Sequence, residues 1–303
     1  HIIDVLSCKT TQMRFMDAND LMPLIDRHYP ELWYGIDADR FPYLRALQNS
    51  ILQAADTISV TASDDESGLR APITDDLYVQ LSVFKIVTKK VRRKREVTQE
   101  PVLREIPVKA LLREKPRVIH IVGPAGSGKT TAIRRLAYTL AQKALSDASA
   151  PVIPILLKAK IIASNADSLL SHAMATAVSL SPSKKTCFSD DDLIKGNVLI
   201  LIDALDEAPA ATRVSVVNRI LRFHQNHPKC QVLLTSRDYT SILDRKEIQG
   251  LPRYNLTPFD IQKAQKLLKK VASGRMTTSH AAGELLRQLQ DVHGIDLNPL
   301  LVT

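Results

Sequence analysis

The spacing of hydrophobic residues in the N-terminal part of the chain predicts helices followed by one strand. Apolar residues recur every three or four positions in Asn19–Arg27 and Arg40–Ala55, as they do on one face of an amphipathic helix. The polar stretch Thr61–Gly68 is a predicted loop, where we expect a domain boundary. Apolar and polar residues then alternate in Leu77–Val87, which indicates a strand, and Pro107–Glu114 is a predicted short helix.

From Arg117 onward, strand-sized apolar runs alternate with segments of helical spacing. The predicted strands are Val118–Val122, Val152–Leu157, Val198–Ile202, Gln231–Thr235 and Arg253–Leu256. The predicted helices between them are Thr130–Leu145 and Thr212–Phe223. This alternation is typical of a parallel sheet that is covered by helices on both faces. The fold class is therefore predicted to be α/β, with a parallel sheet flanked by helices, a helical N-terminal region and the start of a helical lid.

Four regions follow from these elements. Residues 1–75 are expected to form the helical N-terminal region, and 76–115 a strand and basic linker that lead to the core. Residues 116–256 form the core, and 257–303 begin the lid, where Thr257 is a good N-cap and Pro258 occupies the first helical position. The apolar end of the chain has no helix-ending signal, so we expect it to be part of a longer protein.

Composition and charge narrow the class of protein. Of the 303 residues, 45% are hydrophobic and 24% are charged, which is ordinary for a soluble globular protein with a sizeable core. The apolar runs are far shorter than the roughly 18 residues that a membrane span needs. The cysteines are three and widely spaced, which predicts neither a disulfide framework nor a metal cluster and favours the reducing cytoplasm.

The net charge of +9 is concentrated in residues 85–95, which hold seven lysines and arginines. Such a stretch can meet a polyanion such as nucleic acid, or it can be a solvated strand end or loop.

Residues 123–130 match the phosphate-binding pattern G-x-x-x-x-G-K-[ST] at every position. The predicted nucleotide-binding residues are Gly123, Pro124, Ala125, Gly126, Ser127, Gly128, Lys129, Thr130 and the adjoining Thr131. Glycines in such a loop let successive N–H groups converge on phosphate oxygens, and the helix that follows directs its positive end at them. Lys129 is expected to reach the β- and γ-phosphates, and the Thr130 hydroxyl to take one magnesium position. The loop lies between an apolar strand and an amphipathic helix, which is the context that such a loop requires.

Three acids and one arginine follow two of the later strands. Asp203 ends an apolar strand, where ligands bind in open α/β sheets, and is expected to hold magnesium. Asp206 or Glu207 can orient or deprotonate the attacking water, although two acids at a helix start also suit the helix dipole. Arg237 ends the next predicted strand, where it can sense the γ-phosphate; an exposed structural arginine is the alternative.

Several of these motifs together resemble those of one family. Asp203–Glu207 resembles the extended Walker B motif of NACHT-domain proteins, which belong to the STAND class of signal-transducing NTPases, related to the AAA+ ATPases. Leu234–Arg237 resembles their sensor-1 strand, Tyr254–Phe259 the segment leading into their helical domain, and Asn298–Leu301 a proline motif. The resemblance implies that Pro299 packs on the adenine. Ala204 stands where the family usually has glycine, a change that we expect to matter little.

The resemblance implies a switch that holds ADP at rest, exchanges it for ATP, self-oligomerises and activates an effector. Effector and sensor domains are then expected outside this chain, and many relatives act in antiviral defence or innate immunity. We therefore expect a slow, regulatory, magnesium-dependent ATP hydrolase in the cytoplasm. The first alternative is an AAA+-type, nucleic-acid-dependent ATPase that uses residues 85–95. The second is a nucleotide-gated scaffold that binds ADP and never hydrolyses ATP.

Overall fold

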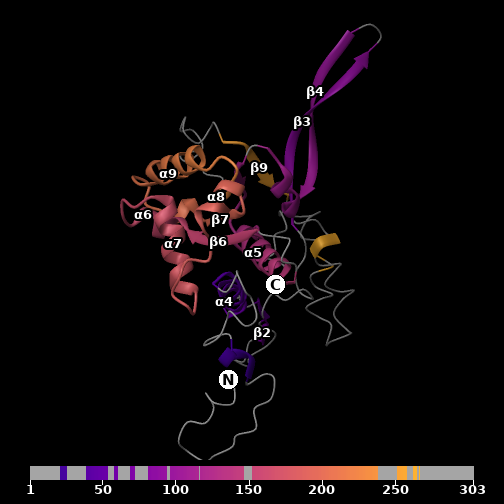
Figure 1. Cartoon of the computed structure of the whole chain (residues 1–303). Helices are drawn as coiled ribbons and strands as arrows, with labels where there is room; N and C mark the ends of the chain where they lie inside the picture. The colour runs from indigo at the N-terminus through magenta and orange to yellow at the C-terminus, as the bar shows by residue number, and fades with distance from the viewer. Residues whose placement is uncertain are drawn as a thin grey trace, which may run out of the picture.

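A computed structural model describes the central core of the chain and short segments before and after it (Figure 1). The described residues are 21–25, 39–53, 58–60, 69–71, 81–93, 96–115, 117–146, 152–237, 251–257, 262–264 and 266. For 58–60, 69–71, 85–93 and 96–103 the description covers the backbone alone.

Seven strands form one mixed sheet in the order β4-β3-β9-β5-β8-β7-β6. The strands in that order are β4 (Glu96–Pro107), β3 (Ser82–Arg93), β9 (Arg253–Leu256), β5 (Val118–Val122), β8 (Gln231–Ser236), β7 (Val198–Asp203) and β6 (Ile153–Lys158). The five strands from β9 to β6 are parallel, whereas β3 and β4 add an antiparallel edge. A separate antiparallel pair joins β1 (Ile58–Val60) and β2 (Leu69–Ala71).

Helices cover both faces of this sheet, as Figure 1 shows. They are α4 (Arg40–Gln53), α5 (Lys129–Ser146), α6 (Ala159–Ala163), α7 (Leu169–Leu180), α8 (Asp190–Lys195) and α9 (Arg213–Asn226), with 3₁₀ turns η2 (Val108–Arg113) and η3 (Leu205–Glu207). Alternate residues of one strand serve the two faces: Ile200 belongs to the cluster that includes α4, α7 and α9, and Leu199 and Leu201 belong to the cluster that includes η2. The predicted α/β class with a parallel sheet flanked by helices is confirmed. None of the described helices is long and apolar enough to cross a membrane.

Two N-terminal expectations differ from the structure. The predicted strand Leu77–Val87 is described from Ser82 and continues through the basic stretch to Arg93, because twelve residue pairs link it to β4. Residues expected to form a linker are therefore part of a long two-stranded ribbon that projects from the body (Figure 1). Thr61–Gly68 lies outside the described residues, but its flanks pair as β1 and β2, so the region expected to be helical includes strands. β-Branched Ile58 and Val60 suit that extended backbone.

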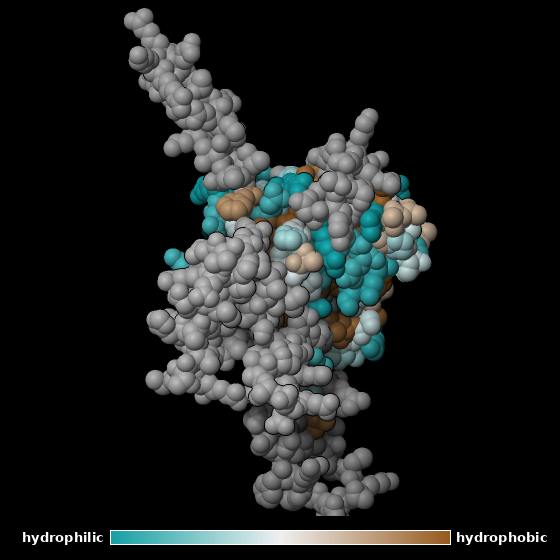
Figure 2. Space-filling model, turned by 180° about the vertical axis from the view of Figure 1, so that it is seen from behind, coloured by the Kyte–Doolittle hydropathy of each residue, from teal (hydrophilic) through white to brown (hydrophobic). Residues whose placement is uncertain are grey.

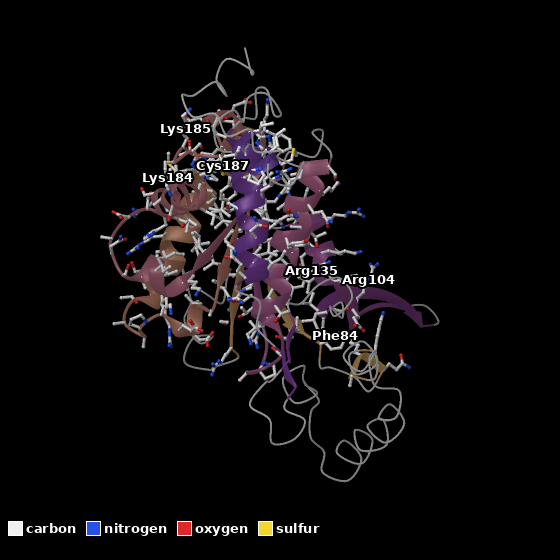
Figure 3. The ribbon with its side chains drawn as sticks, turned by 90° about the horizontal axis from the view of Figure 1, so that it is seen from below. Phe84, Arg104, Arg135, Lys184, Lys185 and Cys187 are labelled. Atoms are coloured by element: carbon white, nitrogen blue, oxygen red, sulfur yellow. The ribbon has the colours of Figure 1, made fainter. Side chains whose placement is uncertain are left out.

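The N-terminal helix α4 packs into the core rather than apart from it. The Tyr43 hydroxyl donates a buried hydrogen bond to the Pro154 carbonyl (2.9 Å), and Leu44 and Leu47 join the cluster beneath β6 and β7. Arg40 at its first turn donates to both carboxylate oxygens of Asp192 on α8 (3.0 and 3.1 Å). Figure 3 shows α4 in indigo, with Cys187 near one end.

The Asp192 carboxylate, which binds Arg40, also accepts hydrogen bonds from residues near its own helix. Burial by itself raises the pKa of the Asp192 carboxyl, but hydrogen bonds from Ser189 and Asn197 and the charge of Arg40 together lower it below its usual value. Ser189 also accepts from the Asp192 N–H, which completes a capping box at the start of α8. The carboxylate therefore stays ionised and paired at neutral pH, and α4 is tied to the core by a charge-assisted contact.

Candidate functional site

The loop between β5 and α5 has the backbone geometry that a phosphate cradle requires. Gly126 and Gly128 have positive φ angles of 71° and 87°, which side chains with a Cβ rarely adopt. A Cβ on Gly123 would approach Ser127 Oγ to 3.0 Å and Leu256 Cβ to 3.2 Å, so the loop is also closely packed there. The two positive-φ glycines lie just before the start of an 18-residue helix, a position that suits an anionic ligand.

Lys129, the first residue of α5, lies within this loop. Its Nζ donates to the carbonyls of Gly123 (2.8 Å) and Pro124 (2.6 Å) and lies 3.3 Å from Ser127 Oγ. Burial lowers the pKa of the Lys129 ammonium, the Asp206 and Asp203 carboxylates oppose that effect, and Arg237 adds to it. The ammonium is thus bound to neutral carbonyls that an anionic oxygen can replace with a stronger, charge-assisted bond.

Thr130 and Asp203 meet at the carboxyl edge of the sheet. The Thr130 hydroxyl donates to Asp203 Oδ1 (3.1 Å), and the Thr235 hydroxyl on β8 donates to the same oxygen (2.8 Å). Asp203 is only 8% exposed. One hydroxyl and one carboxylate are the hard oxygen ligands that Mg²⁺ takes beside a bound phosphate, so these two residues fit that ion. No cluster of three or more His, Cys, Asp or Glu that could hold a metal occurs in the described part of the chain.

The two acids after β7 have different surroundings. Asp206 has a side chain only 6% exposed; its Oδ1 accepts from the Arg237 backbone N–H (2.9 Å) and its Oδ2 from Arg237 Nε (3.1 Å). Glu207 is exposed, and its carboxylate has no hydrogen bond or ion pair with any residue that the structure describes. Arg237 is itself 44% exposed, so its guanidinium reaches solvent at the same edge as the acids.

Ala204 corrects one expectation from the sequence. It adopts a left-handed conformation, with φ of 57° and ψ of 65°, directly after Asp203. A left-handed residue with a Cβ costs about 1–2 kcal/mol, which is why glycine suits this position. The alanine is therefore not a neutral change. Its N–H donates to Thr235 Oγ1 (2.9 Å), which helps to hold the strained turn.

Thr235 and Ser236 belong to the motif Leu234–Arg237, but neither was predicted individually as a residue of the candidate site. Thr235 joins Asp203 to the Ala204 N–H, as described above, and Ser236 accepts the Gly123 N–H on its carbonyl (3.3 Å). Ser236 Oγ lies 2.8 Å from Nε2 of the buried His120 and donates to the Arg237 carbonyl (3.0 Å). Polar residues at the end of the otherwise apolar run Val232–Leu234 were the available signal. His120 is a buried core residue with this hydrogen bond.

The structure brings most of the predicted residues to one edge of the sheet. The contacts above involve the loop 123–128, Lys129, Thr130, Asp203, Asp206 and Arg237. Glu207 adjoins Asp206 in the chain. Pro124 and Ala125 are exposed at the loop, and Thr131 is half-buried in the first turn of α5. Pro299 and Pro258 lie outside the described residues. Figure 2 shows the molecule from behind, where hydrophilic residues make up most of the described surface, with small apolar patches.

Comparisons with known proteins agree with this arrangement at the level of a family. A sequence-family model described as NACHT domain matches residues 117–275, which is more than half of the chain. No curated protein sequence matches this chain.

Among solved structures, the chain is similar to the FIGL-1 AAA domain in complex with ADP, with 16% identity, 59% of this chain and 56% of that chain covered, and a TM-score of 0.37. It is also similar to a katanin chain from work on the structural basis for katanin self-assembly, with 17% identity, 54% and 48% covered, and a TM-score of 0.33. The chain spans about half the length of these solved chains.

Proposed function

This chain belongs to the NACHT domain family, and from that premise we propose that it is the nucleotide-binding and ATP-hydrolysing switch module of a STAND signalling protein. The observation that carries the proposal is the Thr130–Asp203 contact beside the glycine loop, because it joins a phosphate cradle to the ligand set of a nucleotide-bound magnesium ion. Asp203 is buried and accepts hydrogen bonds from the Thr130 and Thr235 hydroxyls. If a cation took the place of one of these donors, the Asp203 carboxylate would serve as its ligand.

Binding of ATP or ADP would use the loop N–H groups and Lys129. The Lys129 ammonium would exchange the Gly123 and Pro124 carbonyls for β- and γ-phosphate oxygens. The Thr130 hydroxyl and the Asp203 carboxylate would hold Mg²⁺, directly or through water. Bound there, Mg²⁺ would neutralise phosphate charge and so assist in-line attack by water. We assign adenine contact to Pro299 by family resemblance alone.

Asp206 and Glu207 would have different roles in ATP hydrolysis. Asp206 has both carboxylate oxygens occupied by Arg237, so its role is to position that arginine at the edge of the site. Glu207 has an exposed carboxylate that can accept a hydrogen bond from the attacking water and take its proton. Arg237, held by Asp206, would respond to the γ-phosphate, and its contact would differ between ATP and ADP.

The identity of the bound nucleotide, ATP or ADP, would set the state of this module, and the rate of turnover would matter less. Slow hydrolysis would return an ATP-bound, self-oligomerised form to an ADP-bound resting form. Sensor and effector segments outside this chain would read that difference, in antiviral defence or innate immunity and in the cytoplasm. The module would have four parts. They are an N-terminal region (1–75), a linking ribbon (76–115), a core (116–256) and the start of a lid (257–303).

Phosphate release tests the proposed function. Purified protein incubated with ATP and Mg²⁺ is expected to release phosphate slowly, and excess EDTA is expected to stop release because the Thr130–Asp203 pair would then have no ion to hold. Release that continues unchanged in EDTA would contradict a magnesium-dependent mechanism. Binding of ADP with no phosphate release at high protein concentration would favour the scaffold alternative.

A second candidate, a nucleic-acid-dependent ATPase, is favoured by the β3–β4 ribbon. β3 carries five lysines and arginines and no acid. The strand register places glutamates opposite Lys89 and Arg93 but none opposite Lys85, Lys90 or Arg92. β9 pairs with β3 only at Val83 and Phe84, so the described ribbon extends beyond the sheet as two strands. The major groove of B-form DNA is wide enough to admit a two-stranded ribbon of this kind.

Charge reversal in the ribbon tests this candidate. Replacing Lys90 and Arg92 with glutamate is expected to weaken binding of a fluorescent DNA duplex at least tenfold and to reduce the salt dependence of binding. Lys109→Glu with Arg113→Glu, two exposed cations on η2, is the matched control and should have a smaller effect. Equal losses in both variants, or an ATPase rate that neither DNA nor RNA changes, would contradict a dedicated nucleic-acid surface.

A further inference from the structure

Arg213 has contacts with the main chain on both sides of Glu207. It is the first residue of α9, and it reaches back toward the turn that follows β7. Its Nε donates to the Ala208 carbonyl (2.8 Å), and one terminal nitrogen donates to the Asp206 carbonyl (2.7 Å). The two acceptors are the residues immediately before and after Glu207, so one guanidinium brackets that residue.

The position of this cation is unfavourable for the helix that carries it. A positive charge in the first turn faces the positive end of the helix dipole, which costs about 0.3–1 kcal/mol. The first turn of α9 holds no acid to offset that charge. Thr212, the N-cap, makes no side-chain capping bond either. Arg213 thus contributes little to the start of α9, and its geometric role lies in the turn before it.

That turn needs external support. η3 is one 3₁₀ turn, held by the Glu207 N–H to the Ala204 carbonyl (3.0 Å) and the Ala208 N–H to the Leu205 carbonyl (3.1 Å). Such short turns have poor hydrogen-bond geometry, and this one follows the strained Ala204. The buried side chains of Leu205 and Ala208 fix its ends. Arg237 holds the Asp206 side chain, and Arg213 holds the carbonyls.

We propose that Arg213 is a positioning residue for ATP hydrolysis: its guanidinium fixes the backbone on either side of Glu207 and so sets where the Glu207 carboxylate stands relative to the attacking water. This inference rests on the proposed function. A planar guanidinium can serve both carbonyls at once, whereas a lysine ammonium on a flexible stem has no such fork. The bracket leaves the Glu207 carboxylate itself unengaged by the described residues, as a base requires.

The test compares Arg213→Ala and Arg213→Lys with Arg219→Ala as the matched control. Arg219 lies on the same helix and also donates to a main-chain carbonyl, that of Ile162 (2.6 Å), away from the acidic turn. We expect Arg213→Ala to lower kcat about 10- to 100-fold with the Kd for ATP within twofold, and Arg213→Lys to recover part of the loss. Arg219→Ala should lower the Tm but leave kcat within twofold.

Two further readouts separate positioning from general support. Hydrogen–deuterium exchange in residues 204–210 should be faster in Arg213→Ala, measured without nucleotide, and unchanged in Arg219→Ala. In a Glu207→Gln background, Arg213→Ala should cause no additional loss in single-turnover hydrolysis, because the residue acts through Glu207.

The outcomes distinguish this inference from the function on which it rests. If Glu207→Gln itself leaves hydrolysis unchanged, the proposed function is wrong at that residue. If Glu207→Gln abolishes hydrolysis while Arg213→Ala keeps wild-type kcat, or if exchange in 204–210 does not change, the inference about Arg213 is overturned. An equal loss in the presence and absence of the Glu207 carboxylate also overturns it. Should Arg213→Ala not fold, Arg213→Lys carries the same comparisons.

Discussion

Replacing Lys129 with alanine is expected to raise the Kd for ATP and ADP at least about 100-fold. The Lys129 ammonium is held at the loop by the Gly123 and Pro124 carbonyls, where it can meet phosphate oxygens. Hydrogen bonds between charged groups contribute about 1.5–3 kcal/mol each, so the loss of two accounts for this factor or more. Isothermal titration calorimetry with each nucleotide measures the change.

Lys143→Ala is the matched control for that variant. Lys143 is an exposed lysine in the last turn of the same helix, so its removal changes net charge equally but leaves the loop intact. Its Kd is expected to stay within twofold of wild type. Unchanged nucleotide affinity in Lys129→Ala, with the fold verified by circular dichroism, would mean that residues 123–130 do not bind phosphate.

Replacing Glu207 with glutamine is expected to lower kcat for ATP hydrolysis 10²- to 10⁴-fold, the range typical of a lost general base. The amide has nearly the shape of the carboxylate but cannot take a proton from water. Because Glu207 is exposed and its carboxylate has no hydrogen bond or ion pair with a described residue, the Kd for ATP and the Tm should change little. Rapid-quench single-turnover kinetics with saturating protein measures the chemical step.

Two comparisons sharpen this second result. Asp190→Asn changes an exposed acid on α8 by the same chemistry and should have no effect on hydrolysis. Asp206→Asn should behave differently from Glu207→Gln: it weakens the pairing of the buried Asp206 carboxylate with the more exposed Arg237 and is expected to lower the Tm as well as the rate. A wild-type rate in Glu207→Gln would contradict its role as base and favour a scaffold that does not hydrolyse ATP.

Local patterns along the chain were enough to predict the core. Apolar runs such as Val198–Ile202 indicate buried parallel strands whatever lies around them, and the glycines of the loop mark the turn before α5. Asp203 could be placed beside Thr130 because the carboxyl ends of parallel strands share one edge of a sheet. These predictions depend on periodicity and on topology that few folds violate.

What the sequence did not reveal depends on contacts between distant segments. The basic stretch extends as a ribbon because β4 pairs with it residue by residue, a pairing that charge alone does not indicate. Ala204 looked interchangeable with glycine until its φ was known, since a backbone angle has no signature in a single residue. The role of Thr235 depends on Ala204 and Asp203, which lie 31 and 32 positions away. Arg213 is a local case: its partners lie only 5 and 7 positions away, but the spacing of residues does not reveal that a side chain reaches back to main-chain carbonyls.

The different surroundings of Asp206 and Glu207 are a further feature that the sequence did not reveal. Both are acids after the same strand, and the sequence gives no reason to prefer one. The structure pairs the first with Arg237 and leaves the second exposed. Adjacent residues of like chemistry can thus be proposed for different roles only when their partners are known.

Identification of the nucleotide that co-purifies with the protein tests the central claim most directly. Protein purified without added nucleotide, denatured in acid and analysed by chromatography with mass detection, is expected to release ADP or ATP. Lys129→Ala, prepared in parallel, is expected to release at least tenfold less. A wild-type protein that releases no nucleotide and binds neither ATP nor ADP when they are added would contradict the account.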